Sequence, residues 1–504
     1  MSLRRIAVST VTLVVAVAPA MATGQAPAAT ADREWRVTKT IDDGSAGTLR
    51  WAIEGSSATP ARDVIVVDLP PGEVVAVTSP LPRLVGPLLI QGAAWARAGR
   101  FAVIDGSGYV TGNGPESCPG ATAGQFGANV RTMTSPGLQI IDTADVEIAG
   151  VEVRRFCIGV LINRSTRTVI RDSRFVENHG GAGVMLTGDD GQGNPTSTTT
   201  TDNKILRSEF LDNGDGLELT RGAAFNLVAG NTFRSTVANP EPSQGIEILR
   251  GNDNVVAENR FEGYSDGLQI NWGDRNYIVA NTFTGNTFGL NLTGLRNVVE
   301  GNTITGNRIG VVVRPADPSP IVRLKGNRIS ANTAAIRRCE AGGSCDDATP
   351  TGAIVMGLPG LEHESFTGSR GRGVTMNPAT IQYICPSHAP GCQGPPNQGT
   401  TPPTLTAATV SASTVVVTGR LTALANARYE VEFFGNTRAT AADAEVALDN
   451  VVVVTDGQGN ASFTVRIARD RVRGLRALTA TATSAAGATS PLSPRLSLTA
   501  LVSR

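Results

Sequence analysis

Short apolar runs separated by asparagine and glycine corners repeat along the middle of the chain. The repeat is marked by Gly245, Gly267, Gly289 and Gly310 and has a period of 21 or 22 residues. A period of this length, built from brief strands and corners, is typical of a solenoid. A flat sheet would not produce this recurrence, whereas a winding with three short strands per coil would. We therefore predict a parallel β-helix, right-handed by the general preference of crossover connections.

The same pattern predicts which side chains stack inside the coils. Residues two and seven positions after the first corner asparagine point inward, as do two residues of the strand after the glycine. Each should lie about 4.8 Å from its equivalent in the next coil, the distance between hydrogen-bonded strands. The predicted stacks are Val256 with Ile278 and Val299, Phe261 with Phe283 and Ile304, Leu268 with Leu290 and Val311, and Ile270 with Leu292 and Val313.

The corner asparagines have a structural explanation. Asparagine tolerates left-handed backbone angles and can hydrogen-bond the neighbouring coil, so stacked copies would hold the turns together. Two such ladders are expected, one of Asn254, Asn276 and Asn297 and one of Asn259, Asn281 and Asn302.

Five regions follow from the pattern around the repeats, and together they indicate an all-β protein. Residues 1–22 are a predicted signal peptide, because two arginines precede an apolar run and a small-residue cleavage site. The other regions are an N-terminal cap with the first coils at 32–110, the β-helix at 111–338, disulfide-containing loops and a Pro-rich linker at 339–403, and an Ig-like β-sandwich at 404–504.

Two local signals add detail to the ends of the chain. Thr48 can cap a helix whose apolar residues Leu49, Ala52 and Ile53 share one face. This helix would cover the open edge of the first coil, where backbone groups would otherwise lack partners. In the C-terminal region, Asp456–Asn460 is interpreted as a hairpin turn between two alternating strands.

Composition narrows the classes of partner and compartment. The 44 basic and 44 acidic residues balance, which argues against nucleic acid as a partner. No later stretch approaches the roughly 20 apolar residues of a membrane helix, so we expect an extracellular protein. Six cysteines fit an oxidising compartment. The expected pairs are Cys339 with Cys345, Cys385 with Cys392 and, among those left, Cys118 with Cys157.

These features together resemble the secreted bacterial proteins with right-handed parallel β-helix (pectate-lyase-like) repeats. The segment Thr48–Ile53 is similar to the N-terminal segment of a subgroup named for its Cys-Ser-Leu-Arg-Glu-Ala motif, although the cysteine is absent and Trp51-Ala52 follow the arginine. Phe433–Asn436 and Gly457–Phe463 resemble parts of the small β-sandwich often appended to that subgroup. The resemblance implies the fold for most of the mature chain. It implies no single function, because this superfamily holds lyases, hydrolases, epimerases and adhesins.

Polar residues gather on the strand that follows each repeat glycine. Aligning the coils places Asp215, Gln244 and Asp266 just before this strand, and Glu218, Glu247, Gln269 and Asn291 outward, two residues beyond the glycine. Glu218 and Glu247 would be one strand spacing apart, where like charges disfavour joint ionisation. The candidate catalytic residues are Asp215, Glu218, Glu247 and Asp266, and the candidate substrate-binding residues are Arg221, Arg250, Gln269, Asn271 and Trp272.

This constellation allows more than one chemistry. Carboxylates two coils apart would be separated by about 10 Å, near the spacing used in inverting glycoside hydrolysis. Adjacent carboxylates could instead bind calcium, with arginine as the base, as in a polysaccharide lyase. Trp272 would provide a surface on which a sugar stacks. Insertions at 188–202 and 234–244 would wall the same face, as insertions at solenoid binding faces often do.

The leading hypothesis is a secreted β-helix protein that binds an extracellular polysaccharide through this groove and could cleave it as a lyase or a hydrolase. The alternative is a non-enzymatic adhesion or structural module, on which the carboxylates form a merely solvated acidic column. The histidines are weaker candidates for a functional site. His179 at a corner could act as an acid or base, while His363 and His388 are too scattered for a metal site. Nothing in the sequence indicates an oligomeric state or a certain cofactor.

Overall fold

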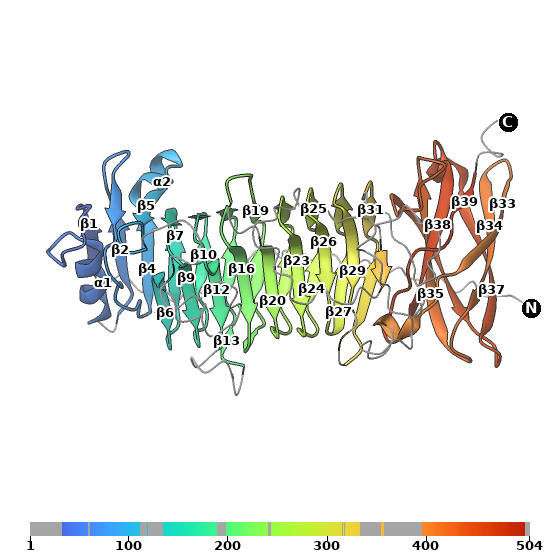
Figure 1. The fold of residues 1–504 in the computed structure, drawn as a ribbon, viewed down its shortest axis with the longest axis horizontal. Coiled ribbons are helices and arrows are strands. Elements are labelled where there is room, and N and C mark those ends of the chain that lie inside the picture. The colour runs from blue at the N-terminus through green and yellow to red at the C-terminus, as the bar shows by residue number, and fades with distance from the viewer. Residues whose placement is uncertain are drawn as a thin grey trace, which may run out of the picture.

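The protein is an elongated solenoid with a β-sandwich at its C-terminal end (Figure 1). The computed structural model describes residues 33–58, 61–110, 118, 135–188, 198–239, 243–314, 316, 318–332, 354–356 and 396–498. The predicted signal peptide, His363, His388 and the two cysteine pairs of 339–392 lie outside these residues. Neither helix in the described part has the length and apolarity that crossing a membrane requires.

Three parallel sheets run the length of the solenoid. The first is ordered β1 (Glu34–Val37), β2 (Asp63–Val67), β4 (Leu88–Gly92), β7 (Val146–Ala149), β10 (Val169–Arg171), β14 (Lys204–Leu206), β18 (Leu227–Ala229), β21 (Val255–Ala257), β24 (Tyr277–Val279), β27 (Leu295–Glu300) and β30 (Ile321–Lys325). The second is ordered β3 (Val74–Ala76), β5 (Ala102–Asp105), β8 (Val151–Arg154), β11 (Arg174–Val176), β15 (Glu209–Leu211), β19 (Thr232–Arg234), β22 (Arg260–Glu262), β25 (Thr282–Thr284), β28 (Thr303–Thr305) and β31 (Arg328–Ser330). The third is ordered β6 (Pro136–Ile141), β9 (Ile158–Asn163), β12 (Ala182–Thr187), β16 (Asp215–Thr220), β20 (Gln244–Leu249), β23 (Asp266–Asn271), β26 (Phe288–Leu292), β29 (Ile309–Val313) and β32 (Ile354–Met356). A further short pair joins β13 (Thr200–Thr201) to β17 (Ala223–Ala224).

The predicted interior stacks are confirmed. Strand pairing places Val256 opposite Ile278 and Ile278 opposite Val299, and all three side chains are fully buried. In the second sheet Phe261 and Phe283 stack with ring centroids 4.7 Å apart. The aromatic column also includes Phe175, Phe210 and Phe233. Each coil therefore buries its apolar side chains against the next, which is the hydrophobic core of the solenoid.

The asparagine ladders are also confirmed, with one correction to their geometry. The side-chain amide of Asn281 donates to Asn302 Oδ1 at 3.0 Å and to the Val256 carbonyl at 2.9 Å. Its oxygen accepts from the backbone N–H of Asn259 at 2.8 Å. The expected left-handed angles fall on the residue before each asparagine, such as Ala280 at φ 55°. The ladder asparagines can therefore point their amides into the corner, while the preceding residue turns the chain.

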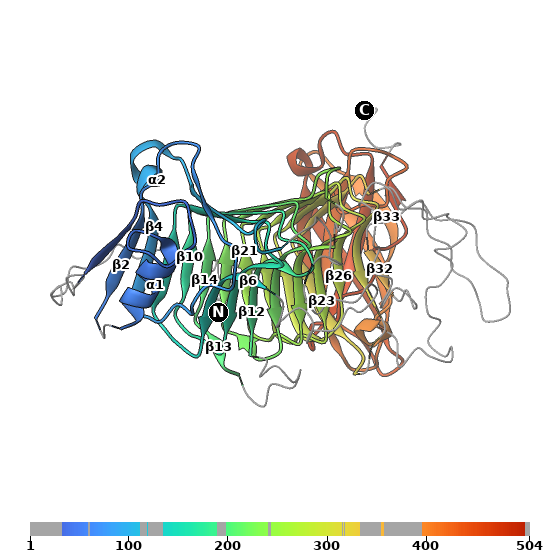
Figure 2. The ribbon, with the colours of Figure 1, turned by 60° about the vertical axis from the view of Figure 1, so that its left-hand side comes forward.

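A helix closes the first coil as predicted. Helix α1 (Leu49–Ser57) begins after Thr48, whose hydroxyl accepts from the Trp51 N–H, and it buries Leu49, Ala52 and Ile53. It lies beside β1 and β2 at the N-terminal end of the solenoid (Figure 2). A second short helix, α2 (Ala93–Ala98), follows β4. The first coil is thus covered by an apolar helix face instead of ending in an open edge.

The C-terminal region forms two antiparallel sheets with a shared core. One contains β33 (Thr404–Val410), β34 (Thr414–Thr422) and β37 (Asn460–Ala468), and the other contains β36 (Val446–Val454), β35 (Arg428–Asn436), β38 (Ala477–Ser484) and β39 (Leu496–Ser497). Short 3₁₀ turns lie at Pro396–Gly399 and Arg469–Val472. Phe433 of one sheet packs against Phe463 of the other, with ring centroids 5.7 Å apart, and this contact between the two sheets confirms a sandwich.

The predicted hairpin at Asp456–Asn460 is wrong. The segment does reverse the chain, with Asp456 N–H donating to the Asn460 carbonyl at 2.8 Å. However, β36 before it pairs with β35, whereas β37 after it pairs with β34. The turn therefore carries the chain from one sheet to the other, which alternation along single strands does not reveal.

The sandwich docks on the last coil of the solenoid through polar contacts. Gly326 N–H donates to the Glu432 carboxylate at 3.0 Å, and Arg323 pairs with Glu430 at 3.3 Å. Burial, together with the neighbouring Glu430, raises the pKa of Glu432 to about 7, against the opposing Gly326 hydrogen bond and Lys325. Protonation of this carboxyl is therefore favoured when the sandwich is docked.

We expect Asn281→Ala to lower the free energy of unfolding by about 2–4 kcal/mol, because it leaves the buried Asn259 N–H and Val256 carbonyl without their partners. Urea unfolding followed by circular dichroism measures this. The exposed Asn450→Ala serves as the control and should cost little. Equal, small effects at both positions would show that the ladder does not stabilise the coils.

We expect the docked sandwich to lose stability as pH rises. The pKa of Glu432 is about 7 in the folded protein and near 4.5 without the docking, so the stabilisation is complete below about pH 4.5 and is lost as pH rises through about 7. Partial exposure limits the change to about 1–2 kcal/mol. Urea unfolding across this window should show the slope in wild type and in the exposed control Glu73→Gln, and a reduced slope in Glu432→Gln. An unchanged slope in Glu432→Gln would contradict the assignment.

Candidate functional site

The outward residues of the third sheet stack as the sequence alignment predicted, even across the two insertions. Glu218 of β16 pairs in register with Glu247 of β20, and Glu247 pairs with Gln269 of β23. Asp266 lies opposite Gln244, so Asp215 and Asp266 begin strands that are two apart in the sheet. The insertions themselves fall partly outside the described residues.

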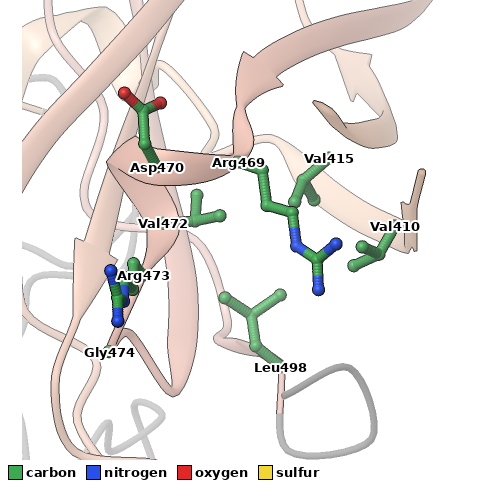
Figure 3. A pocket seen from close by; sticks show the side chains of 8 residues that line it. All are labelled: Val410, Val415, Arg469, Asp470, Val472, Arg473, Gly474 and Leu498. Carbon is green, nitrogen blue, oxygen red and sulfur yellow. The ribbon is translucent and has the colours of Figure 1, made fainter. Parts of the chain in front are cut away.

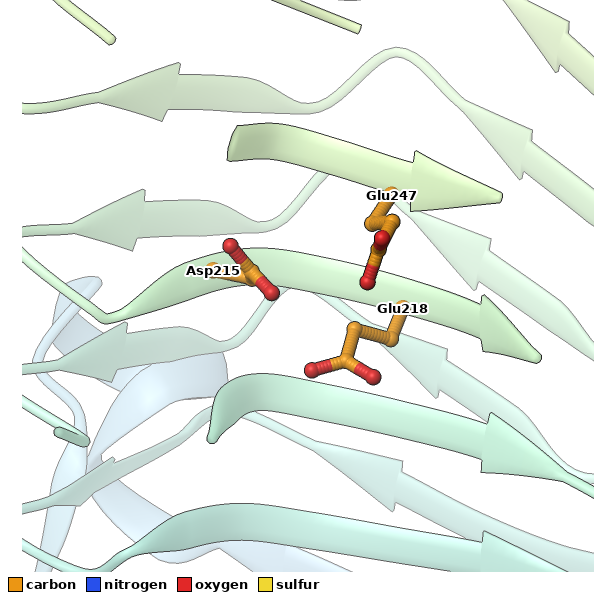
Figure 4. Close-up of side chains that lie close together, drawn as sticks. All are labelled: Asp215, Glu218 and Glu247. Atoms are coloured by element: carbon orange, nitrogen blue, oxygen red, sulfur yellow. The ribbon is translucent and has the colours of Figure 1, made fainter. Parts of the chain in front are cut away.

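Three carboxylates converge on this face. One oxygen each of Asp215, Glu218 and Glu247 lies within 4.8 Å of the others. Figure 4 shows Asp215 and Glu218 on β16, with Glu247 directed toward them from β20. Asp215 is fully buried, Glu218 is 2% exposed and Glu247 is partly buried. Burial of this kind excludes the predicted alternative of a merely solvated acidic column.

A fourth carboxylate, Asp266, lies on the other side of Glu247. It is 3% exposed, and its Oδ1 accepts from the Asn291 side-chain amide at 2.7 Å. Burial raises the pKa of Asp266 to about 6, and the negative charge of Glu247 acts in the same direction. Hydrogen bonds from Asn291 and Ser265 and the positive charge of Arg314 partly oppose this rise. Asp266 can therefore hold or release a proton close to neutral pH.

Sequence analysis missed Arg314, which lies at the centre of a polar network in this site. Its guanidinium donates through Nε to Asn291 Oδ1 at 2.6 Å and also hydrogen-bonds Asn271 Oδ1. Asn271 in turn donates to Glu247 Oε1 at 3.1 Å and to Gln269 Oε1 at 2.6 Å. A signal was present, because Arg314 and Asn271 both stand four residues beyond a repeat glycine. Of these two residues, only Asn271 was among the predicted site residues.

Four of the five predicted substrate-binding residues fall into two groups. Gln269 and Asn271 border Glu247 inside the site. Arg250 and Trp272 stand at its exposed edge, where the guanidinium lies 5.8 Å from the ring centroid and Trp272 is 37% exposed. Arg221 follows β16 and is partly buried, and its backbone N–H donates a hydrogen bond to the Leu249 carbonyl.

Two other locations offer less chemistry. His179 is buried at a corner, with its Nε2 2.8 Å from the Asp212 carbonyl oxygen. A cavity of about 420 Å³ in the sandwich is lined mainly by Val410, Val415, Val472 and Leu498, with the Arg469 guanidinium beside them and the Asp470 carboxylate turned away (Figure 3). No described carboxylate pair faces this cavity. The third-sheet face is the stronger candidate for catalysis.

The acidic site, defined as Asp215, Glu218, Glu247 and Asp266, can do two things chemically. The first three offer hard oxygen ligands at a spacing that suits one calcium ion or a similar cation. They offer no imidazole or sulfur, which copper prefers. Asp266, with a pKa of about 6, can act as a general acid while an ionised neighbour acts as a base.

Comparison with known families agrees with the fold. The model described as right handed beta helix region matches residues 122–261. The model described as periplasmic copper-binding protein (NosD) matches residues 235–345. Each covers less than half of the chain. They confirm the right-handed parallel β-helix that the repeats predicted.

Individual proteins give a sharper result. The chain is 50% identical over 466 residues to a 3-dehydroshikimate dehydratase from Acinetobacter baylyi, covering 91% of this chain and 94% of the relative. Among solved structures, the periplasmic alginate epimerase AlgG is 14% identical with a TM-score of 0.37, covering 53% of this chain and 68% of that one. The polygalacturonase from Erwinia carotovora is 8% identical with a TM-score of 0.30, covering 61% and 97%. These two likenesses concern the kind of fold and carry nothing about chemistry.

We expect calcium to bind at Asp215, Glu218 and Glu247, because a cation relieves the repulsion among three close carboxylates. At about 100 times its Kd it should stabilise the protein by about 2–3 kcal/mol, seen as a rise in Tm. The double variant Glu218→Gln with Glu247→Gln should lose this rise, and the exposed Glu258→Gln should keep it. A rise that persists in the double variant would place the cation elsewhere.

Proposed function

This chain belongs to the family of the 3-dehydroshikimate dehydratase from Acinetobacter baylyi, and from this membership we propose that it is a dehydratase acting on 3-dehydroshikimate or a closely related cyclic hydroxy keto acid. The single observation that carries the proposal is identity of 50% across 91% of the chain, which spans both the solenoid and the sandwich. The acidic site supplies the groups that such a reaction needs.

Loss of water from 3-dehydroshikimate is an elimination next to a ketone. A base removes the proton from the carbon between the ketone and the leaving hydroxyl, and the electron pair is held as an enolate. The C–O bond on the next carbon then breaks, and the hydroxyl leaves as water with a proton from an acid. A ring proton moves to the former ketone oxygen, and the product is an aromatic dihydroxybenzoate. The reaction therefore needs one base and one acid at adjacent carbons.

The acidic site offers this pair on neighbouring strands. In our assignment Asp266 is the acid, because burial keeps it protonated up to about pH 6, its pKa. Glu247 of β20 is the base when the site is free of calcium, and it is held by the Asn271 amide at 3.1 Å. Gln269 lies opposite Glu247, on the same strand as Asp266, and can hydrogen-bond the substrate's oxygens. Asp215 and Glu218 complete the site beside Glu247.

Burial favours a small substrate over a polymer. A polysaccharide must contact several coils along an open face, whereas Asp215, Glu218 and Asp266 are each at most 3% exposed. The polysaccharide hypothesis remains the second candidate because of one feature, the exposed Trp272 with Arg250 beside its ring. Such a pair could stack on a sugar at the edge of the site.

We also place the protein outside the cytoplasm. The disulfide between Cys118 and Cys157 supports an oxidising compartment. The basic and apolar character of residues 1–22 supports export through a signal peptide. Detection of the mature chain in periplasmic or culture fractions, beginning after residue 22, would test this.

We expect the purified protein to convert 3-dehydroshikimate to an aromatic product, followed by ultraviolet absorbance. Asp266→Asn and Glu247→Gln should each lower kcat/KM by at least about 100-fold, because each removes a proton-transfer group. In wild type, kcat/KM should fall as pH rises above about 6, because Asp266 loses the proton that it must donate.

The exposed Glu258→Gln is the matched control and should keep full activity. A panel of polysaccharides, tested with and without calcium, separates the rival functions. Turnover of a polysaccharide but not of 3-dehydroshikimate would replace the dehydratase by a lyase or hydrolase. Binding without turnover would indicate a lectin-like module, and neither would indicate adhesion or structure.

A further inference from the structure

Arg314 lies behind the acidic site and reaches it through two asparagines. It follows β29, is 2% exposed and is among the largest fully buried side chains of the described residues. Its Nε donates to Asn291 on β26, and its terminal nitrogen hydrogen-bonds Asn271 on β23. One guanidinium thus connects three neighbouring strands of the sheet that carries the site.

These bonds fix the orientation of both amides. A guanidinium only donates hydrogen bonds, so each asparagine must turn its side-chain oxygen toward Arg314 and its side-chain nitrogen the other way. The Asn291 nitrogen then donates to Asp266 Oδ1 at 2.7 Å, and the Asn271 nitrogen donates to Glu247 Oε1 at 3.1 Å. If either amide rotated by half a turn, it would present oxygen to a carboxylate, which is repulsive. Arg314 therefore determines which end of each amide faces the site.

We propose that Arg314 is a positioning residue of the active site, which orients Asp266 through Asn291 and Glu247 through Asn271. The proposal rests on the dehydratase function assigned above. Arg314 is then the shared residue that holds the hydrogen-bond partners of both the acid, Asp266, and the base, Glu247. A change at Arg314 therefore disturbs both at once.

The charge of Arg314 has a second, separable effect. The charged groups around Asp266 are Arg314, which lowers its pKa, and Glu247, which raises it, with Asp215 and Glu218 beyond Glu247. Removing the positive charge should move the pKa of Asp266 above about 6. Lysine at this position would keep the charge but lose the two-pronged geometry. The two variants therefore separate charge from orientation.

The test compares Arg314→Gln, Arg314→Lys and Asn291→Leu with the exposed control Arg328→Gln. We expect Arg314→Gln to lower kcat by about 10–100-fold, the range typical of residues that orient metal ligands through hydrogen bonds, with KM nearly unchanged. The alkaline limb of its pH profile should shift upward. Arg314→Lys should lower kcat without shifting the alkaline limb. The losses in kcat caused by Asn291→Leu and by Arg314→Lys should not add when the two changes are combined.

A measurement without turnover keeps the inference independent of the assigned reaction. The titration of Asp266 appears as the difference in the pH dependence of urea unfolding between wild type and Asp266→Asn. This difference spans about pH 4 to 6, because stability is lost as pH rises through the raised pKa, and it should extend to higher pH on an Arg314→Gln background. If wild type shows no dehydratase activity, the assigned function is wrong, but the positioning role of Arg314 is still tested by the unfolding measurement. A wild-type rate and unfolding profile in Arg314→Gln, or a rise in KM alone, would overturn the positioning role.

Discussion

Hydrogen bonds between parallel strands fix the register of every coil, so each side chain must lie directly over its equivalent in the coil before. The effect of one side chain on the stability of the fold therefore depends on the whole column, meaning the side chains at the equivalent position of the other coils. A column of phenylalanines stacks, as in Phe233, Phe261 and Phe283. A column of asparagines bonds to itself and to the backbone. A column holding Glu218 and Glu247 places like charges together, which burial makes worse.

The arrangement around those carboxylates is organised to offset that cost. Amide side chains replace carboxylates in the following coils, at Gln269 and Asn291, and Arg314 brings a positive charge one coil later. Asp266 keeps a proton up to about pH 6. The site thus places a carboxyl group with a raised pKa within a few strands of three other carboxyl groups, which suits acid–base chemistry on a small substrate better than a solvated surface does.

Much of this could be predicted from the sequence because a solenoid is periodic. The stacks, the ladders, the Thr48 cap and the pairing of Glu218 with Glu247 all follow from spacing alone. Three things did not follow. Burial of Glu218 depends on packing over the sheet, and the sheet exchange at Asp456–Asn460 depends on non-local pairing. The role of Arg314 depends on its side-chain contacts with Asn291 and Asn271, because its own coil lies three coils from Glu247. The substrate class came from the relative, since carboxylates on a β-helix suit several chemistries.

The central claim is that the stacked acidic column of the third sheet is where a small cyclic acid reacts. A crystal structure of the protein with the dihydroxybenzoate product tests it most directly. We expect the ring to lie over β20 and β23, within hydrogen-bond distance of Glu247 and Asp266. Density for the product only beside Trp272, or only in the sandwich cavity near Arg469, would contradict it.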